Sequence, residues 1–141
     1  MHYFGIFLGW TLVAGFVLES IKYLLKIINQ KEIMLLPKES QLRRNYTSAM
    51  GLIFRTHQYI PLYLITILLI HFLFEVIHQG FYLTGFIAAC LMISQIAIGI
   101  YGTIVKNKKK DIWLYAHRTI TVLLLFTIIL HIITVWGLPA D

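Results

Sequence analysis

The sequence predicts an all-α fold, a bundle of four transmembrane helices that forms a single domain over residues 1–141. The first observation behind this prediction is composition: the 141 residues are 59% hydrophobic and only 13% charged, whereas soluble proteins carry about 25% charged residues. The second is that the charges leave apolar runs as long as the roughly 20 residues that a helix needs to cross a bilayer. Since unpaired backbone groups are not tolerated in lipid, these runs are expected to be helical.

Segments that lack Lys, Arg, Asp and Glu locate the helices in order along the chain. No charged residue precedes Glu19, and the first helix is expected to continue past it. The second charge-free segment ends at Glu75, and a turn near Gly80 separates it from the third. The fourth charge-free segment follows Arg118, and its helix is expected to start earlier, at Asp111 or Ile112. Together these signals predict helices at about 3–28, 48–78, 81–105 and 111–137.

All twelve Lys and Arg residues lie at or between the facing ends of two helix pairs. Cytoplasmic loops carry the excess of Lys and Arg, so both basic loops are expected to face the cytoplasm. Both termini are then expected outside, in a multi-pass protein of a prokaryotic cytoplasmic membrane. A net charge of +6 placed between apolar spans does not indicate a nucleic-acid partner. The first loop has Lys22, Lys26, Lys31, Lys38, Arg43, Arg44 and Arg55, and the second has Lys106, Lys108, Lys109, Lys110 and Arg118.

Four histidines form a regular pattern within the spans. His57 and His71 are fourteen residues apart on the second helix, and His117 and His131 are fourteen apart on the fourth. Fourteen residues fall roughly 40° short of four helical turns and rise about 21 Å, so each pair is expected on one helix face. The second and fourth helices run parallel because one helix intervenes. The spacing therefore predicts two facing imidazole pairs, His57 with His117 and His71 with His131.

Ionisable side chains inside a membrane indicate function, and two facing imidazoles suit the axial positions of haem iron between bundle helices. Zinc and copper sites use three or four ligands, and no carboxylate or thiol is expected level with either pair. Cys90 is the only cysteine, so no Cys-x-x-Cys-His motif attaches haem covalently. A lone membrane histidine is often a hydrogen-bonding group, which remains the alternative for each position. His2 and His78 have no counterparts and are expected to have structural or interfacial roles.

Further residues accompany the histidines. Gly85 and Gly99 on the third helix are also fourteen apart, which suits the approach of a flat cofactor or helix packing. Arg55 and Arg118 each lie within two residues of a histidine, and they are expected either to bind haem propionates or to end the spans as cytoplasmic anchors. Pro61 follows the first histidine by four residues and predicts a local kink.

Paired His-x13-His helices with a Gly-x13-Gly helix between them resemble the four-helix, two-haem bundle of cytochrome b from quinol–cytochrome c oxidoreductases. In that family the N-terminus of the bundle is cytoplasmic, whereas the charges here predict it outside. The predicted orientation is more similar to the haem core of ferric reductases and NADPH oxidases, although this chain has no Gly-x-Gly-x-x-Gly nucleotide motif. The resemblance implies two b haems between the second and fourth helices, with His57, His71, His117 and His131 as axial ligands.

The expected function is that of a di-haem b-type cytochrome, an electron-transfer subunit of a membrane oxidoreductase rather than a complete enzyme. Redox partner subunits are expected, and a quinone is a further candidate. One alternative is a quinone-reactive anchor of a respiratory dehydrogenase or reductase, with a site near Glu75 and His78. A haem or metal transporter subunit, using Ser94 and Gln95 on its pathway, and a structural assembly subunit are the others.

Overall fold

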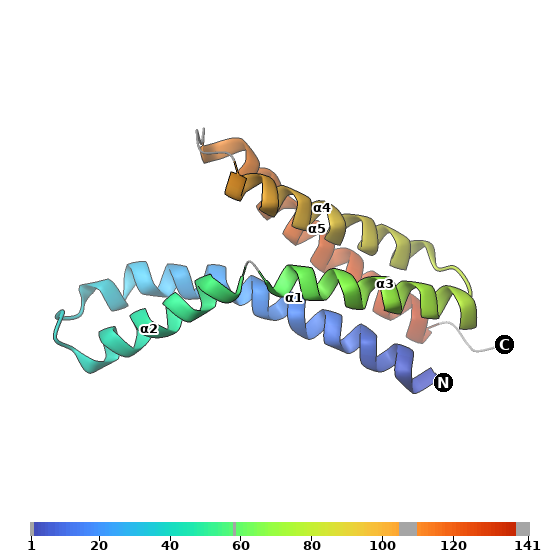
Figure 1. The fold of residues 1–141 in the computed structure, drawn as a ribbon, viewed down its shortest axis with the longest axis horizontal. Helices are drawn as coiled ribbons and strands as arrows, with labels where there is room; N and C mark the ends of the chain where they lie inside the picture. Colours follow the sequence, from blue (N-terminus) through green and yellow to red (C-terminus); the bar gives the residue numbers. More distant parts are fainter. Residues whose placement is uncertain (1, 58, 105–109, 138–141) are drawn as a thin grey trace.

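The computed structural model describes residues 2–57, 59–104 and 110–137, and in these ranges the chain is helical without any strand. This confirms the all-α prediction. A short 3-10 turn, η1, separates the first two helices, and Figure 1 shows how the elements follow one another. The elements are α1 (His2–Lys31), η1 (Ile33–Leu35), α2 (Gln41–Thr56), α3 (Ile60–His78), α4 (Leu83–Ile104) and α5 (Lys110–Gly137).

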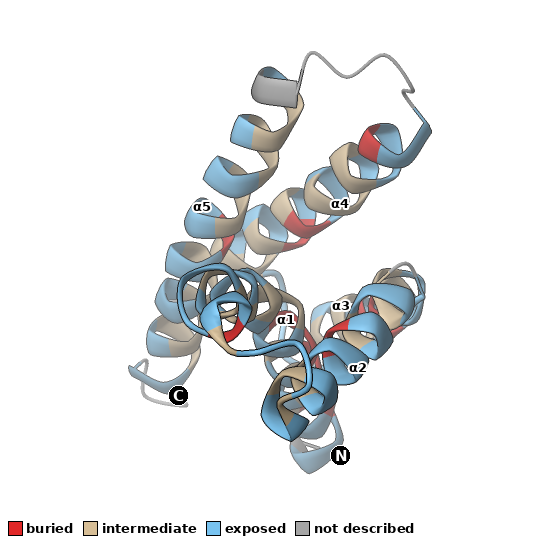
Figure 2. Ribbon diagram, turned by 90° about the vertical axis from the view of Figure 1, so that its left-hand side faces the viewer, coloured by how far each residue is buried: buried red, intermediate tan, exposed pale blue. Residues whose placement is uncertain are grey.

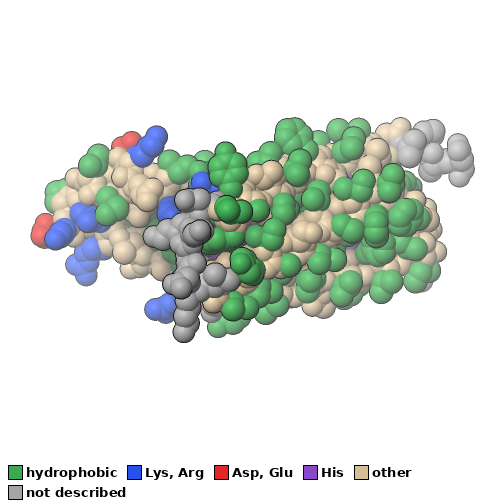
Figure 3. Space-filling model, turned by 90° about the horizontal axis from the view of Figure 1, so that it is seen from above, with side chains coloured by type: hydrophobic (Ala, Val, Ile, Leu, Met, Phe, Trp, Pro, Cys, Tyr) green, Lys and Arg blue, Asp and Glu red, His purple; other side chains and the backbone are tan. Residues whose placement is uncertain are grey.

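Four of the described helices are long and apolar enough to cross a membrane, namely α1, α3, α4 and α5. Most of their large apolar side chains point away from the molecule, and Leu124 is the one large side chain among the described residues that is almost completely buried, at 1% exposure. Figure 3 shows the apolar side chains covering the longer part of the molecule, with the charged ones gathered at the other end. An apolar outer surface of this extent, on four helices of sufficient length, indicates a multi-pass membrane protein.

The membrane-spanning helices pack as two pairs, α1 against α3 and α4 against α5, with a smaller contact between α3 and α4. Figure 2 shows the buried positions where helices face each other and exposed positions on their outer faces. The start of α1 and the end of α5 lie at the same end of the molecule (Figure 1). The core that joins the pairs consists of Leu8, Leu12, Phe16, Leu64, Ile67, Leu68, Ala89, Met92 and Leu124.

The expected single helix over 48–78 is wrong, because the structure divides it into α2, which ends at Thr56, and α3, which begins at Ile60. Pro61 explains the division. Its ring lacks an N–H and clashes with the carbonyl of the residue four positions earlier, so it ends one helix and suits the first turn of the next. His57 is consequently the C-cap of α2 rather than a residue of α3, and the 14-residue spacing does not place it on one continuous helix with His71.

Residues 22–55, which we call the basic hairpin, turn back on themselves beyond the four-helix part. In the hairpin α2 lies against the second half of α1, where Tyr46 donates a hydrogen bond to the Leu25 carbonyl oxygen at 2.7 Å. Ile33 and Met50 are buried there, at 8% and 6% exposure. The hairpin continues the long axis of the molecule (Figure 1). Most of the other basic loop, including Lys106, Lys108 and Lys109, lies outside the described residues.

Candidate cofactor site

A cavity of about 730 Å³ lies between the two helix pairs, in the half of the bundle where α1 begins. All four membrane-spanning helices line it, and most of its lining is apolar. His71 of α3 and His131 of α5 both line it, so the two imidazoles share one cavity. The volume lies within the range of about 300–1,000 Å³ that is typical of cofactor and ligand sites.

Glycine backbones approach both imidazoles of this pair. A Cβ atom on Gly9 would lie 3.3 Å from Cε1 of His71, and one on Gly85 would lie 2.9 Å from Cε1 of His131. A contact of 2.9 Å would force the His131 ring to move. The Nδ1 atom of His71 is buried and has no hydrogen-bond partner among the described residues. A buried polar atom without a partner is costly in a folded chain and points to a missing ligand or proton acceptor.

The His131 ring is oriented by two threonines. Thr84 Oγ1 of α4 lies 3.1 Å from His131 Nδ1 and 3.1 Å from Thr134 Oγ1, and Thr134 donates to the His131 carbonyl oxygen at 2.8 Å. Because Nδ1 is engaged, Nε2 remains as the nitrogen with which His131 can bind a ligand.

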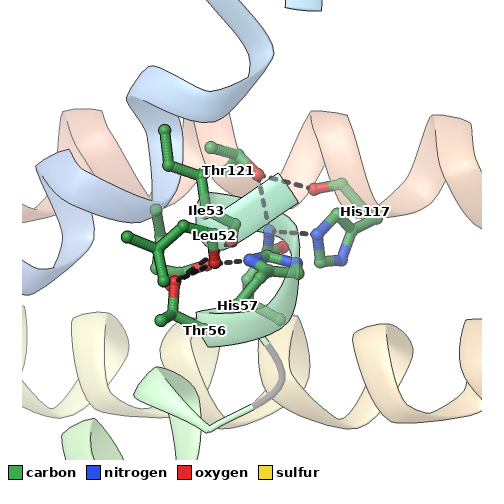
Figure 4. Close-up of polar contacts among 8 residues, drawn as sticks. Leu52, Ile53, Thr56, His57, His117 and Thr121 are labelled. Carbon is green, nitrogen blue, oxygen red and sulfur yellow. Dashed lines mark hydrogen bonds and ion pairs between the residues drawn. The ribbon is translucent and has the colours of Figure 1, made fainter. Parts of the chain in front are cut away.

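The second imidazole pair, His57 and His117, lies toward the basic hairpin, and Figure 4 shows the two side chains next to each other with Thr121 beside His117. Gln95 Nε2 of α4 donates to Thr121 Oγ1 at 2.6 Å and lies 3.1 Å from His117 Nε2. Thr121 donates to the His117 carbonyl oxygen at 2.8 Å. His117 Nδ1 is buried without a partner among the described residues. A Cβ atom on Gly99 would lie 3.5 Å from His117 Cε1, which is an ordinary contact.

Glu19 of α1 pairs with Nδ1 of His57. The expectation that no carboxylate would lie level with either pair is therefore wrong: α1 continues past its apolar run and brings Glu19 beside the C-cap of α2. The Glu19 side chain is 15% exposed and that of His57 is 35% exposed. A carboxylate on Nδ1 orients an imidazole whose Nε2 binds a metal. Among the described residues, no group of three His, Cys, Asp or Glu side chains gathers as a metal site.

The structure places the other residues that the sequence indicated in different surroundings. Arg55 is exposed, and the Arg118 guanidinium lies 4.8 Å over the Tyr23 ring; their roles toward propionates stay predictions. His78 is exposed, stacks on Phe74 at 4.3 Å and places Nδ1 2.9 Å from the Phe74 carbonyl oxygen.

The residues named for the alternative functions, among them Glu75 and Ser94, also lie in different places. Glu75 lines the cavity and packs against Gly5. Ser94 donates to the carbonyl oxygen of Cys90 in its own helix, at 2.8 Å. The side chain of His2 lies outside the described part of the structure.

The sequence analysis did not predict several residues of the site, although sequence patterns that could have indicated them are present. Thr121 and Thr134 follow a histidine by four and three residues, which is one helical turn. Glu19 is the first charged residue of an otherwise apolar stretch, and charges within spans indicate function. Gly9 belongs to a Gly-x-x-x-Gly pair with Gly5, a pattern of close helix approach.

Comparisons of the chain with protein-family models, with curated proteins and with solved structures found no match.

Proposed function

We propose that this chain is a di-haem b-type cytochrome that carries electrons across the membrane as a subunit of a redox complex. The observation that supports it best is the apolar cavity between the helix pairs, lined by His71 and His131 with glycine backbones beside both rings. A b haem with two histidine ligands would need an apolar space between helices and one imidazole from each of two helices. A bound b haem supplies one-electron redox chemistry.

His71 and His131 would hold the outer haem. The chain's own contribution there is orientation and exclusion of water. The contact from Thr84 at Nδ1 of His131 would leave Nε2 for iron, and the His71 imidazole would supply the second nitrogen from the opposite side of the cavity. Apolar helices around the cavity keep the site in a low-dielectric setting, which tunes the reduction potential.

His57 and His117 would hold the inner haem, nearer the basic hairpin. Glu19 at Nδ1 of His57 leaves Nε2 of that ring for iron. At His117 the amide of Gln95 lies at Nε2 instead. A donor and an iron ion need the same lone pair, so binding through Nε2 requires the Gln95 amide to turn away. Arg55 and Arg118 are proposed as partners of the propionates at this boundary, because guanidinium pairs well with carboxylate.

Two non-covalent haems per chain are the expected result of a pyridine haemochrome assay on protein purified after expression with added haem precursor. Acid–acetone should extract both, because the chain lacks a Cys-x-x-Cys-His motif. A variant with alanine at His57, His71, His117 and His131 serves as the control and should contain none. A wild-type ratio near zero, in protein that is inserted and helical by circular dichroism, would rule out the proposal.

A quinone-reactive membrane anchor is the second candidate, and one observation favours it. Glu75 and His71 line the same apolar cavity, one helical turn apart on α3, and a carboxyl and an imidazole are groups that accept protons when a quinol is oxidised. Quinone extracted in place of the outer haem would support this candidate. Both proposed functions include the exchange of electrons with a partner protein.

Both termini are proposed to lie outside the cytoplasm. A fusion of alkaline phosphatase after Asp141 is expected to be active, because the reporter folds only where disulfides form. The same reporter inserted in the 106–110 loop should be inactive, since the Lys-rich loop is expected to stay in the cytoplasm. High activity from the loop fusion together with an inactive C-terminal fusion would reverse the topology.

A further inference from the structure

The basic hairpin is a preformed element rather than a loose loop. Its two helices are joined by the Tyr46–Leu25 hydrogen bond and by Lys22 Nζ, which lies 5.0 Å from the centre of the Phe54 ring. At its tip Arg43 Nη1 donates to the Leu36 carbonyl oxygen at 2.7 Å and lies 3.4 Å from that of Met34. These contacts fix η1 against the first turn of α2, so a partner would meet an already ordered surface and lose little entropy on binding.

The hairpin stands beyond the membrane rather than lying along it. The 30 residues of α1 span about 45 Å at 1.5 Å per residue, whereas the hydrocarbon core is about 30 Å thick. The last ten or so residues of α1 therefore extend past the bilayer core, and α2 runs back along them. Figures 1 and 3 show the hairpin continuing the long axis of the bundle, with the charged side chains gathered at this end. Its tip consequently faces water and not lipid.

The surface of the hairpin combines positive charge with exposed apolar side chains. Residues 22–55 contain seven Lys or Arg and two Glu. Lys26, Lys38 and Arg44 are exposed. At the tip, Leu35 is 80% exposed and Leu42 is 59% exposed. A small apolar centre within a charged rim is the usual anatomy of a protein interface.

We infer that the basic hairpin is the docking surface for a soluble protein with an acidic surface, which exchanges electrons with the inner haem. The inference rests on the proposed function for what is exchanged, while the docking itself rests on charge complementarity and on the position of the tip. Opposite charges speed association and orient the partner. A membrane partner is disfavoured because the tip points along the bundle axis, away from the lipid surface that anionic headgroups would offer.

The test uses wild-type protein in phosphatidylcholine nanodiscs, which carry no net lipid charge, and a fluorescein-labelled acidic flavodoxin as the probe. Fluorescence anisotropy gives Kd without any need for haem. The triple variant Lys26→Glu, Lys38→Glu and Arg44→Glu is expected to weaken binding about tenfold or more at low salt and to lose most of its salt dependence. The variant Lys26→Arg, Lys38→Arg and Arg44→Lys keeps the charges and should bind like the wild type.

Reduction kinetics then connect docking with electron transfer. Flavodoxin reduced by dithionite and freed of excess reductant should reduce the triple variant about tenfold more slowly than the wild type at low salt. Excess dithionite should reduce both proteins to the same extent, which shows that the haems are intact. If the triple variant is poorly inserted, the single variant Lys38→Glu replaces it, with a smaller loss expected.

Equal affinity of wild type and charge-reversed protein for the probe would overturn the inference. So would a loss of binding confined to phosphatidylglycerol vesicles or to a DNA oligonucleotide, because the hairpin would then recognise lipid or nucleic acid. Absence of haem in the wild type would refute the proposed function instead, and the anisotropy measurement would still decide whether an acidic protein docks.

Discussion

His131→Ala is expected to lower the haem content from two per chain to one, and to remove the same haem that His71→Ala removes. The reason is that both imidazoles line one cavity between the helix pairs, although they belong to α5 and α3. Six-coordinate haem iron needs both axial ligands. The reduced-minus-oxidised spectra of the two variants, each with its pyridine haemochrome ratio, should therefore coincide and differ from those of His57→Ala and His117→Ala.

His78→Ala is the matched control for this experiment. His78 is on α3 like His71 but is exposed and stacks on Phe74 of its own helix, so its removal should leave both haems in place. Each variant must first be shown to insert and to remain helical, because an empty cavity weakens packing. If inserted His71→Ala and His131→Ala proteins lost spectroscopically different haems, the pairing across the helix bundle would be wrong.

Gly85→Val should weaken binding of the outer haem while leaving the inner haem bound. A Cβ atom at this position would lie 2.9 Å from Cε1 of His131 and 3.4 Å from its Nε2, so the ring must move from the position that Thr84 supports. Overpacking of this kind costs about 1–3 kcal/mol, which corresponds to about a 5- to 150-fold loss of affinity. The measurement is haem titration of the extracted protein, followed at the wavelengths of the outer haem. Gly85→Ala should give a smaller loss.

Two glycine controls separate this effect from helix packing. Gly51 in α2 has no neighbour within 4 Å of a Cβ atom, so Gly51→Val should leave both haems unchanged. Gly102 packs against Trp113 between α4 and α5, so Gly102→Val should lower the unfolding temperature without a preference for the outer haem. A loss of both haems in parallel with stability in Gly85→Val would show that Gly85 serves packing alone.

Much of the fold was predictable because it depends on local properties. Apolar runs long enough for a bilayer, with the charges between them, locate four helices, and the structure confirms four helices that are long and apolar enough to cross a membrane. The break between α2 and α3 near His57 was not predicted. Pro61 indicated a kink, but whether a proline bends a helix or ends it depends on the neighbours that the freed backbone groups meet. Here α2 ends at Thr56 and lies against the extended part of α1 instead of continuing into α3.

The sequence by itself indicated that His71 and His131 could meet, because helices that run in the same direction carry residues of equal spacing at equal depth. His57 lies at the C-cap of α2, so the same argument does not place it. Only the tertiary structure decided what surrounds each ring. The pairing of Glu19 with His57, and the contacts of Thr84 with His131 and of Gln95 with His117, depend on how each helix is rotated about its axis. In a chain that is apolar on all sides of its helices, hydrophobic periodicity does not reveal that rotation. It is set by the close approach of glycine backbones and by a few polar contacts between helices, which form only when the bundle is assembled.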